Sequence, residues 1–129
     1  MNRNFWQTYW PPLAWAAVLF IQSSIPHVRA PLKLTQWDDK WIHAVIYFPL
    51  GFLLMRSLQQ SQAQRSTTVL LLITFLLGAT YGISDELHQY FVPGRFSDWR
   101  DAVADAIGVA LGSVGYLKCH HRQRNRLNP

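Results

Sequence analysis

The feature that most constrains this chain is the spacing of its charged residues, which leaves four long apolar segments. Charges are absent from 4–26, 41–55 and 66–84 and, except for Asp105, from 102–117. A helix needs about 20 apolar residues to cross the roughly 30 Å hydrocarbon core of a bilayer, and about 17 to 25 is usual. The first and third segments are therefore long enough by themselves, whereas the second and fourth must include polar flanking residues.

A soluble four-helix bundle is the main alternative, but it requires a polar face on every helix. Residues 69–77, with the sequence VLLLITFLL, contain Thr74 as their single polar residue, and residues 13–21 contain none. We therefore predict an all-α protein, a four-transmembrane-helix bundle that forms a single membrane domain over residues 1–129. Its helices are expected at about 11–24, 38–58, 66–90 and 98–119, followed by a basic tail at 120–129.

Local signals indicate where these helices begin and end. Pro11 and Pro12 suit a first helical turn, whose amides have no intrahelical partners, so the first helix is expected to begin near Pro11. Residues 25–36 are expected to form an exposed loop that covers the site described below. Ser97 or Asp98 is expected to cap the fourth helix. The residues that follow this helix are expected to be disordered.

The basic residues predict that both termini lie in the cytoplasm. With four spans, seven Lys and Arg residues flank that side and five flank the other: Arg3, Arg56, Arg65, Lys118, Arg122, Arg124 and Arg126 against Arg29, Lys33, Lys40, Arg95 and Arg100. Positive charge concentrates on the cytoplasmic side of membrane helices. Because the cluster at 118–126 directly follows an apolar segment, the net charge of +5 indicates membrane lipids as partners, and no nucleic acid.

Three helical stripes combine glycines with ionisable residues. The stripes are Asp39, His43, Tyr47 and Gly51; Gly78, Gly82, Glu86 and Tyr90; and Asp101, Asp105, Gly108, Gly112 and Gly115. Spacings of three and four residues place the members of each stripe on one helix face. Glycines allow close helix packing, which serves either the bundle itself or a dimer, and we favour the bundle. The oligomeric state stays open.

Antiparallel neighbours bring the polar ends of the last three helices together, which predicts a polar pocket near the extracytoplasmic face. The candidate catalytic residues are His43, Glu86, Asp85 and Asp105, and the candidate substrate-binding residues are Asp39, Lys40, Tyr47, Gln89, Arg95 and Asp101. Ionisable groups at this depth are costly unless paired, so they indicate function. The structural alternative is an internal network in which Arg95 and Lys40 neutralise the carboxylates. A short connector should keep Arg95 within salt-bridge reach of Asp85, Glu86, Asp101 or Asp105.

Three stretches of the chain resemble the VanZ-like family of membrane proteins: DKWIHAVIYFPLG, YGISDELHQYFVPGR and DAVADAIGVALG. Their order and spacing agree with the family over about residues 37–115, and the segment from DE-x-x-Q to GR is specific. The family's last motif often has Asn where Asp105 stands, although Asp is a common variant. The resemblance implies a small multi-pass protein of the bacterial cytoplasmic (inner) membrane. The family includes members associated with teicoplanin resistance, and no reaction is implied.

Two functions from different classes fit these residues. As an enzyme, the protein would act on a lipid-linked or cell-wall-related substrate, with Glu86, Asp85 or Asp105 as acid, His43 as base and Arg95 holding an anion. As a non-catalytic binding or structural protein, it would recognise a lipid head group or envelope precursor, or act in a glycopeptide-antibiotic context. No cofactor is expected, although oxygen ligands from Asp85, Glu86, Asp101 and Asp105 suit a divalent cation. The single cysteine, Cys119, excludes an intramolecular disulfide and a thiolate-rich zinc site.

Overall fold

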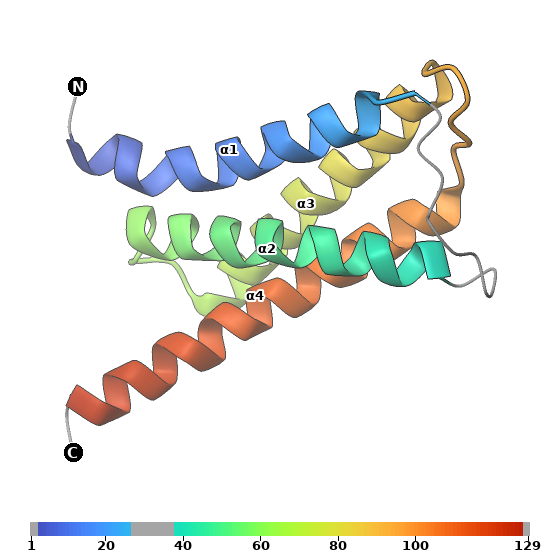
Figure 1. Ribbon diagram of the computed structural model, residues 1–129. Helices are drawn as coiled ribbons and strands as arrows, with labels where there is room; N and C mark the ends of the chain where they lie inside the picture. Colours follow the sequence, from blue (N-terminus) through green and yellow to red (C-terminus); the bar gives the residue numbers. More distant parts are fainter. Residues whose placement is uncertain (1–2, 27–37, 128–129) are drawn as a thin grey trace.

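The computed structural model describes residues 3–26 and 38–127, which form four helices. These are α1 (Arg3–Ser24), α2 (Asp38–Ser61), α3 (Thr67–Tyr90) and α4 (Trp99–Leu127). In the described part of the chain there is no strand, so the prediction of an all-α four-helix bundle is confirmed. The start of α1 and the end of α4 lie at one end of the bundle, and the α3–α4 connection lies at the other (Figure 1).

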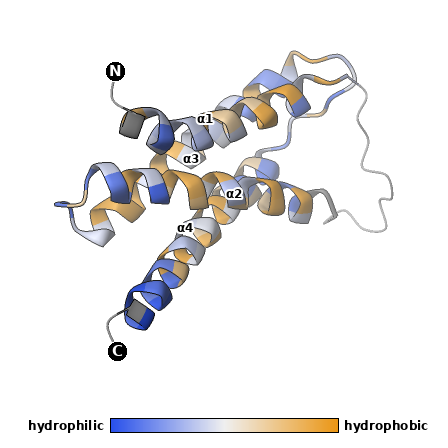
Figure 2. Ribbon diagram, turned by 60° about the vertical axis from the view of Figure 1, so that its left-hand side comes forward, coloured by the Kyte–Doolittle hydropathy of each residue, from blue (hydrophilic) through white to orange (hydrophobic). Residues whose placement is uncertain are grey.

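Three helices are long and apolar enough to cross a membrane, judged by length and composition: Lys40–Ser61, Thr67–Tyr90 and Trp99–Arg126. Two of them, in α2 and α4, include polar flanks as expected. The first helix, α1, has the expected length, with 22 residues, but its first half is rich in Trp, Tyr, Pro and Gln and has few aliphatic residues, so its most apolar stretch is less apolar than those of the other three helices. Figure 2 shows the hydrophobic middle of α4 and its hydrophilic C-terminal end.

The structure corrects the expected start of α1. This helix begins at Arg3 and runs through Pro11 and Pro12, which the sequence placed in its first turn. Pro12 has no amide hydrogen for the carbonyl of Thr8, one turn earlier. The hydroxyl of Ser57 on α2 donates to that carbonyl at 2.6 Å. The neighbouring helix therefore supplies the hydrogen bond that the proline removes.

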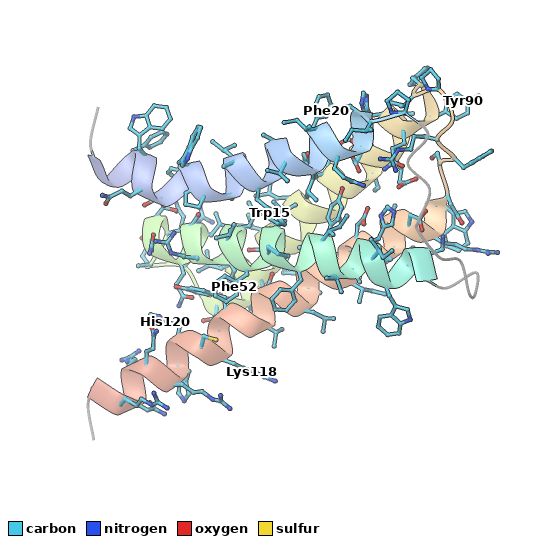
Figure 3. The ribbon with its side chains drawn as sticks, viewed as in Figure 1. Trp15, Phe20, Phe52, Tyr90, Lys118 and His120 are labelled. Atoms are coloured by element: carbon cyan, nitrogen blue, oxygen red, sulfur yellow. The ribbon has the colours of Figure 1, made fainter. Side chains whose placement is uncertain are left out.

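Two further hydrogen bonds attach the middle of α1 to the bundle. The indole nitrogen of Trp15 donates to the carbonyl oxygen of Ile46 on α2 at 2.9 Å, and Figure 3 shows Trp15 between the two helices. The hydroxyl of Tyr81 on α3 donates to the carbonyl oxygen of Ala16 at 2.5 Å. These bonds fix α1 against both α2 and α3.

Glycines on α4 bring its backbone against that of α2. A Cβ atom on Gly108 would lie 2.3 Å from the carbonyl oxygen of Ala44, and one on Gly112 would lie 2.0 Å from that of Phe48. Neither distance is possible for a real side chain, so only glycine permits this crossing. On the third helix, the glycine stripe likewise faces α4. The glycine stripes therefore serve the internal bundle, as favoured from the sequence.

The helix of α4 continues through the basic tail to Leu127, so the expectation of disorder after residue 119 is wrong for the described residues. Arg and Gln, which make up much of this tail, are good helix formers. Basic residues in the last turn, Arg124 and Arg126, also interact favourably with the negative end of the helix dipole. For these two reasons α4 continues beyond its apolar segment.

Candidate functional site

The ionisable residues gather where α2 begins, α3 ends and α4 begins, as the antiparallel arrangement predicts. We call this group the polar cluster; its members are Lys40, His43, Asp85, Glu86, Gln89, Asp101 and Asp105. Of the sequence-predicted site residues, these seven are joined by hydrogen bonds or ion pairs. The cluster lies at the opposite end of the bundle from the start of α1 and the end of α4 (Figure 1).

The centre of the cluster is a pair between His43 on α2 and Asp105 on α4. The Nδ1 atom of His43 lies 2.8 Å from Oδ1 of Asp105, whose side chain is 0% exposed. An aspartate at this position accepts the Nδ1 hydrogen, which leaves Nε2 as the basic nitrogen of the neutral ring. That nitrogen lies 3.8 Å from Oδ2 of Asp101. The geometry therefore orients the imidazole as a base.

Space for Asp105 is provided by Gly82 on α3. A Cβ atom on Gly82 would lie 3.0 Å from the Cβ atom of Asp105 and 3.1 Å from its Oδ2. Any other residue would press on the carboxyl group. In the described part of the chain, Oδ2 has no hydrogen-bond partner. The glycine thus admits a buried carboxylate that is only half satisfied.

The third helix contributes two adjacent carboxyls joined by an amide. Gln89 donates from Nε2 to Oδ2 of Asp85 at 3.1 Å and to Oε1 of Glu86 at 3.4 Å. The backbone amide of Asp98 donates to Oε2 of Glu86 at 2.9 Å. All three side chains of this group on α3 are buried. Glu86 is therefore held from both sides, whereas Oδ1 of Asp85 makes no hydrogen bond of ordinary geometry among the described residues.

Lys40 is the cation that pairs with the acidic groups. Its Nζ lies 3.0 Å from Oδ2 of Asp98 and 2.5 Å from Oδ1 of Asp101. These ion pairs connect the start of α2 to the start of α4. Lys40 was predicted to neutralise carboxylates in the structural alternative, and it does so here.

Asp98 caps the N-terminus of α4, one of the two positions expected from the sequence. Its Oδ1 accepts the amide hydrogen of Arg100 at 2.9 Å. This hydrogen bond, together with the Lys40 ion pair, lowers the pKa of Asp98 below its ordinary value. The aspartate is therefore ionised at neutral pH, where its charge favours the positive end of the α4 dipole.

Tyr47 lies one turn below His43, as its spacing predicts, and is 1% exposed. Its hydroxyl makes no hydrogen bond of ordinary geometry among the described residues, but it lies close enough to the carboxyl group of Asp85 to interact with it, and it also interacts electrostatically with Asp105. Its ring centroid is 6.2 Å from that of Tyr81. Tyr47 therefore lies directly beneath the polar cluster, on the side of the bundle interior.

Arg95 does not pair with any carboxylate in the described part of the chain, so this prediction is wrong. Its Nε donates to the carbonyl oxygen of Ile25 at 3.2 Å, and its Nη2 donates to that of Gln22. The last carbonyls of a helix have no intrahelical partners and carry partial negative charge. Arg95 therefore binds the C-terminus of α1, and Lys40 takes the role that the sequence gave to both cations.

Some expectations fall outside the described residues. The side chain of Asp39 is not described, and neither is most of the loop expected at 25–36. Sequence reasoning also missed the ion pair of Asp98, which it considered only as a cap. The spacing of Asp98 with Asp101 and Asp105 could have indicated it, because these residues share a helix face.

Two cavities of the described structure are lined by residues outside the polar cluster. One, of 510 Å³, lies towards the ends of α2 and α4 and is lined by residues that include Phe52, Arg56, Tyr116 and His120. Figure 3 labels Phe52 and His120 there. The other, of 460 Å³, is an apolar groove between α1, α2 and α3. The pocket expected around the cluster therefore stays a prediction.

Three members of the cluster have the geometry to hold a metal ion. His43, Glu86 and Asp105 each offer one ligand atom, and these atoms lie within 4.8 Å of one another. They come from three different helices. A cation bound there would connect α2, α3 and α4.

Comparison with known proteins places the chain in a family. The family model described as VanZ/LLP1 matches residues 3–120, which include α1, α2, α3, most of α4 and the whole polar cluster. No curated protein and no solved structure matches significantly. With three membrane-span-capable helices and this match over most of its length, the chain is a membrane protein that belongs to the VanZ/LLP1 family.

Proposed function

We propose that this protein acts on the polar head group of a lipid-linked or cell-wall-related substrate in the bacterial cell envelope. The single observation that carries the proposal is the buried His43–Asp105 pair, with 2.8 Å between Nδ1 and Oδ1. Such a pair holds an imidazole in the tautomer whose other nitrogen accepts a proton.

His43 is the proposed base and Glu86 the proposed acid. A ligand atom of each lies within 4.8 Å of the other and of Asp105. Glu86 is fixed by the Asp98 amide and by Gln89, so its carboxyl group is held in one position. Acid and base groups placed this closely can serve one substrate bond. Arg95 has no part in this proposal because its donors bind α1.

The apolar groove supports an amphiphilic substrate. Its walls are mostly apolar and come from three helices; they include Tyr9, Leu13, Leu50, Leu54, Leu77 and Tyr81. The hydroxyls of Ser57 and Tyr81, which also border it, already donate to carbonyl oxygens. The groove therefore suits a hydrocarbon chain. Because Tyr81 lies beside Tyr47, the chain of a bound lipid would run from the polar cluster along the bundle.

In the proposed orientation, the protein lies in the bacterial inner membrane and both of its termini are in the cytoplasm. The start of α1 and the end of α4 lie at one end of the bundle, and the basic residues of α4 follow its apolar part (Figure 1). The cluster would then face outwards. A reporter that is active only outside the cytoplasm, fused after Pro129, should be silent, and strong activity would reverse the orientation.

A second candidate function is binding without catalysis. It is favoured by the Lys40 ion pairs and the Gln89 hydrogen bonds, which satisfy several of the carboxylate oxygens without a substrate. In this function the cluster would recognise a head group or envelope precursor and leave its bonds intact.

The experiment that separates these functions uses purified protein and bacterial lipids. Wild type, His43→Gln and Glu86→Gln are incubated with an extract of polar and polyprenyl-phosphate lipids, and mass spectrometry follows each lipid. The matched control is His88→Gln, because His88 is bonded to Ser24 at 3.0 Å outside the cluster. We expect wild type and control to convert one lipid class and the cluster variants to convert none. Lipid that is retained without conversion would support binding. If wild type neither converts nor retains a lipid, both functions are refuted.

A further inference from the structure

The buried carboxylates outnumber the cations that face them. Four carboxylates of the polar cluster, Asp85, Glu86, Asp101 and Asp105, are buried, and the cations packed against them are Lys40 and, when its ring is protonated, His43. The two nearby arginines interact with other groups. Arg95 binds α1, and the guanidinium of Arg100 lies 5.9 Å from the centroid of the Trp99 ring. Buried charge requires a partner of opposite sign. The carboxylates of the described cluster therefore carry more negative charge than its cations neutralise, and an additional cation would stabilise them.

Unsatisfied oxygen atoms point to the same place independently. Oδ2 of Asp105 is buried and has no hydrogen-bond partner in the described chain. Oδ1 of Asp85 and the hydroxyl of Tyr47 also lack a hydrogen bond of ordinary geometry, but these two groups interact with each other. Buried polar atoms without partners are rare in folded proteins, and a bound ion is one of the ordinary explanations. Asp105 is the strongest case, since its side chain is 0% exposed.

The geometry points to a cation site. We propose that His43, Glu86 and Asp105 bind one divalent metal cation of the Mn²⁺ type. Their ligand atoms lie within 4.8 Å of one another, and bonds of the usual length hold two ligands at most about 4.4 Å apart. A cation shared by the three side chains would therefore draw these atoms closer together.

The donor set selects the kind of metal. One imidazole nitrogen and two carboxylates form a mixed nitrogen and oxygen site, which Mn²⁺ accepts and which lacks the thiolates that soft cations prefer. The free cysteine, Cys119, is exposed near the end of α4 and contributes nothing. Gln89 and the Asp98 amide bind the two oxygens of Glu86, in the manner of the outer partners that orient metal ligands.

A cation bound by His43 and Asp105 would compete with the proton that the two side chains share in their hydrogen bond. The metal-bound form and the acid–base form are therefore two exclusive states of one site. This inference does not rest on the proposed function, because a metal can bind here whether or not a substrate is converted. A failure to bind metal would leave the acid–base proposal standing.

The test uses the full chain in detergent, without a polyhistidine tag and after treatment with EDTA. Electron paramagnetic resonance follows free Mn²⁺ as it is titrated, and spin-echo measurements detect a coordinated nitrogen. We expect one saturable Mn²⁺ per chain and an increase in the temperature of unfolding. Asp105→Asn and Glu86→Gln should each weaken binding by at least about tenfold, and His43→Gln should remove the nitrogen signal.

Two controls keep the result specific. The double variant His120→Ala with His121→Ala removes adjacent exposed imidazoles on α4 and should bind Mn²⁺ as wild type does. Circular dichroism and gel filtration establish that each variant is folded, and two independent ligand variants are compared because one of them could fail to fold. The proposal is overturned if no saturable binding occurs, if folded Asp105→Asn and Glu86→Gln bind normally, or if the control variant loses binding.

Discussion

The backbones of Gly108 and Ala44 touch where α4 crosses α2, since a Cβ atom on Gly108 would lie 2.3 Å from the carbonyl oxygen of Ala44. Gly108→Leu should therefore force the two helices apart and cost about 1 to 3 kcal/mol or more through overpacking. Thermal unfolding in detergent measures the loss. Gly115→Ala is the matched control, because its Cβ would meet only the end of the Phe48 ring, at 3.0 Å. Equal stability of Gly108→Leu and wild type would contradict the packing.

Ser57 replaces the hydrogen bond that Pro12 removes from α1. Ser57→Ala removes this donor from the partly buried carbonyl of Thr8 and should destabilise the protein by about 0.5 to 1.5 kcal/mol. Pro12→Ala restores an amide hydrogen in the helix itself, so Ser57→Ala should cost less in that background. A double-mutant cycle of unfolding free energies tests this coupling. Strictly additive effects would show that the two residues act independently.

Asp98 stabilises the start of α4 in two ways, through the amide of Arg100 and through Lys40. Asp98→Ala should cost about 0.5 to 2 kcal/mol, and Asp98→Asn less, because asparagine also caps helices. The folded-state pKa of Asp98 is lowered. The contribution of ionised Asp98 to the free energy of unfolding is therefore fully present above the ordinary carboxyl pKa, and it is lost as the pH falls through the pKa of Asp98 in the folded protein. Unfolding of Asp98→Asn and wild type should converge in acid, and a constant difference would refute the linkage.

Arg95 connects the α3–α4 turn to the end of α1. Arg95→Gln should loosen that end without affecting the polar cluster, because Arg95 has no carboxylate partner among the described residues. Hydrogen–deuterium exchange should increase in the last turn of α1 and stay unchanged in α4. Arg100→Gln is the control, since the side chain of Arg100 is exposed. Faster exchange around Asp105 would indicate that Arg95 supports the cluster after all.

The sequence predicted the helices and the polar cluster well because both depend on periodicity. Charge-free segments predict membrane helices, and spacings of three or four residues placed His43 and Asp105 on facing sides of α2 and α4. The glycine stripe of Gly108 and Gly112 likewise predicted close packing. Such patterns are repeated over several turns, so local exceptions do not obscure them.

The errors arose where a tertiary contact replaced a local rule. Pro12 normally favours a first turn, but a donor from Ser57 on α2 allows the helix to continue through it. Arg95 lies near the predicted carboxylates in sequence, yet the carbonyl of Gln22 at the end of α1 takes its guanidinium. Neither partner has a fixed spacing in the chain. Knowledge of how α1 lies against the bundle was needed for both.

In the proposed function, the polar cluster acts on a substrate and does not merely hold the helices together. The most direct measurement is lipid conversion by folded Glu86→Gln, because glutamine can still accept the Asp98 amide that Glu86 accepts at 2.9 Å. Its unfolding temperature should fall by less than about 5 °C, which corresponds to roughly 1 kcal/mol, while conversion is lost. Conversion at the wild-type rate by this folded variant, or a loss of stability as large as that of Gly108→Leu, would contradict the account.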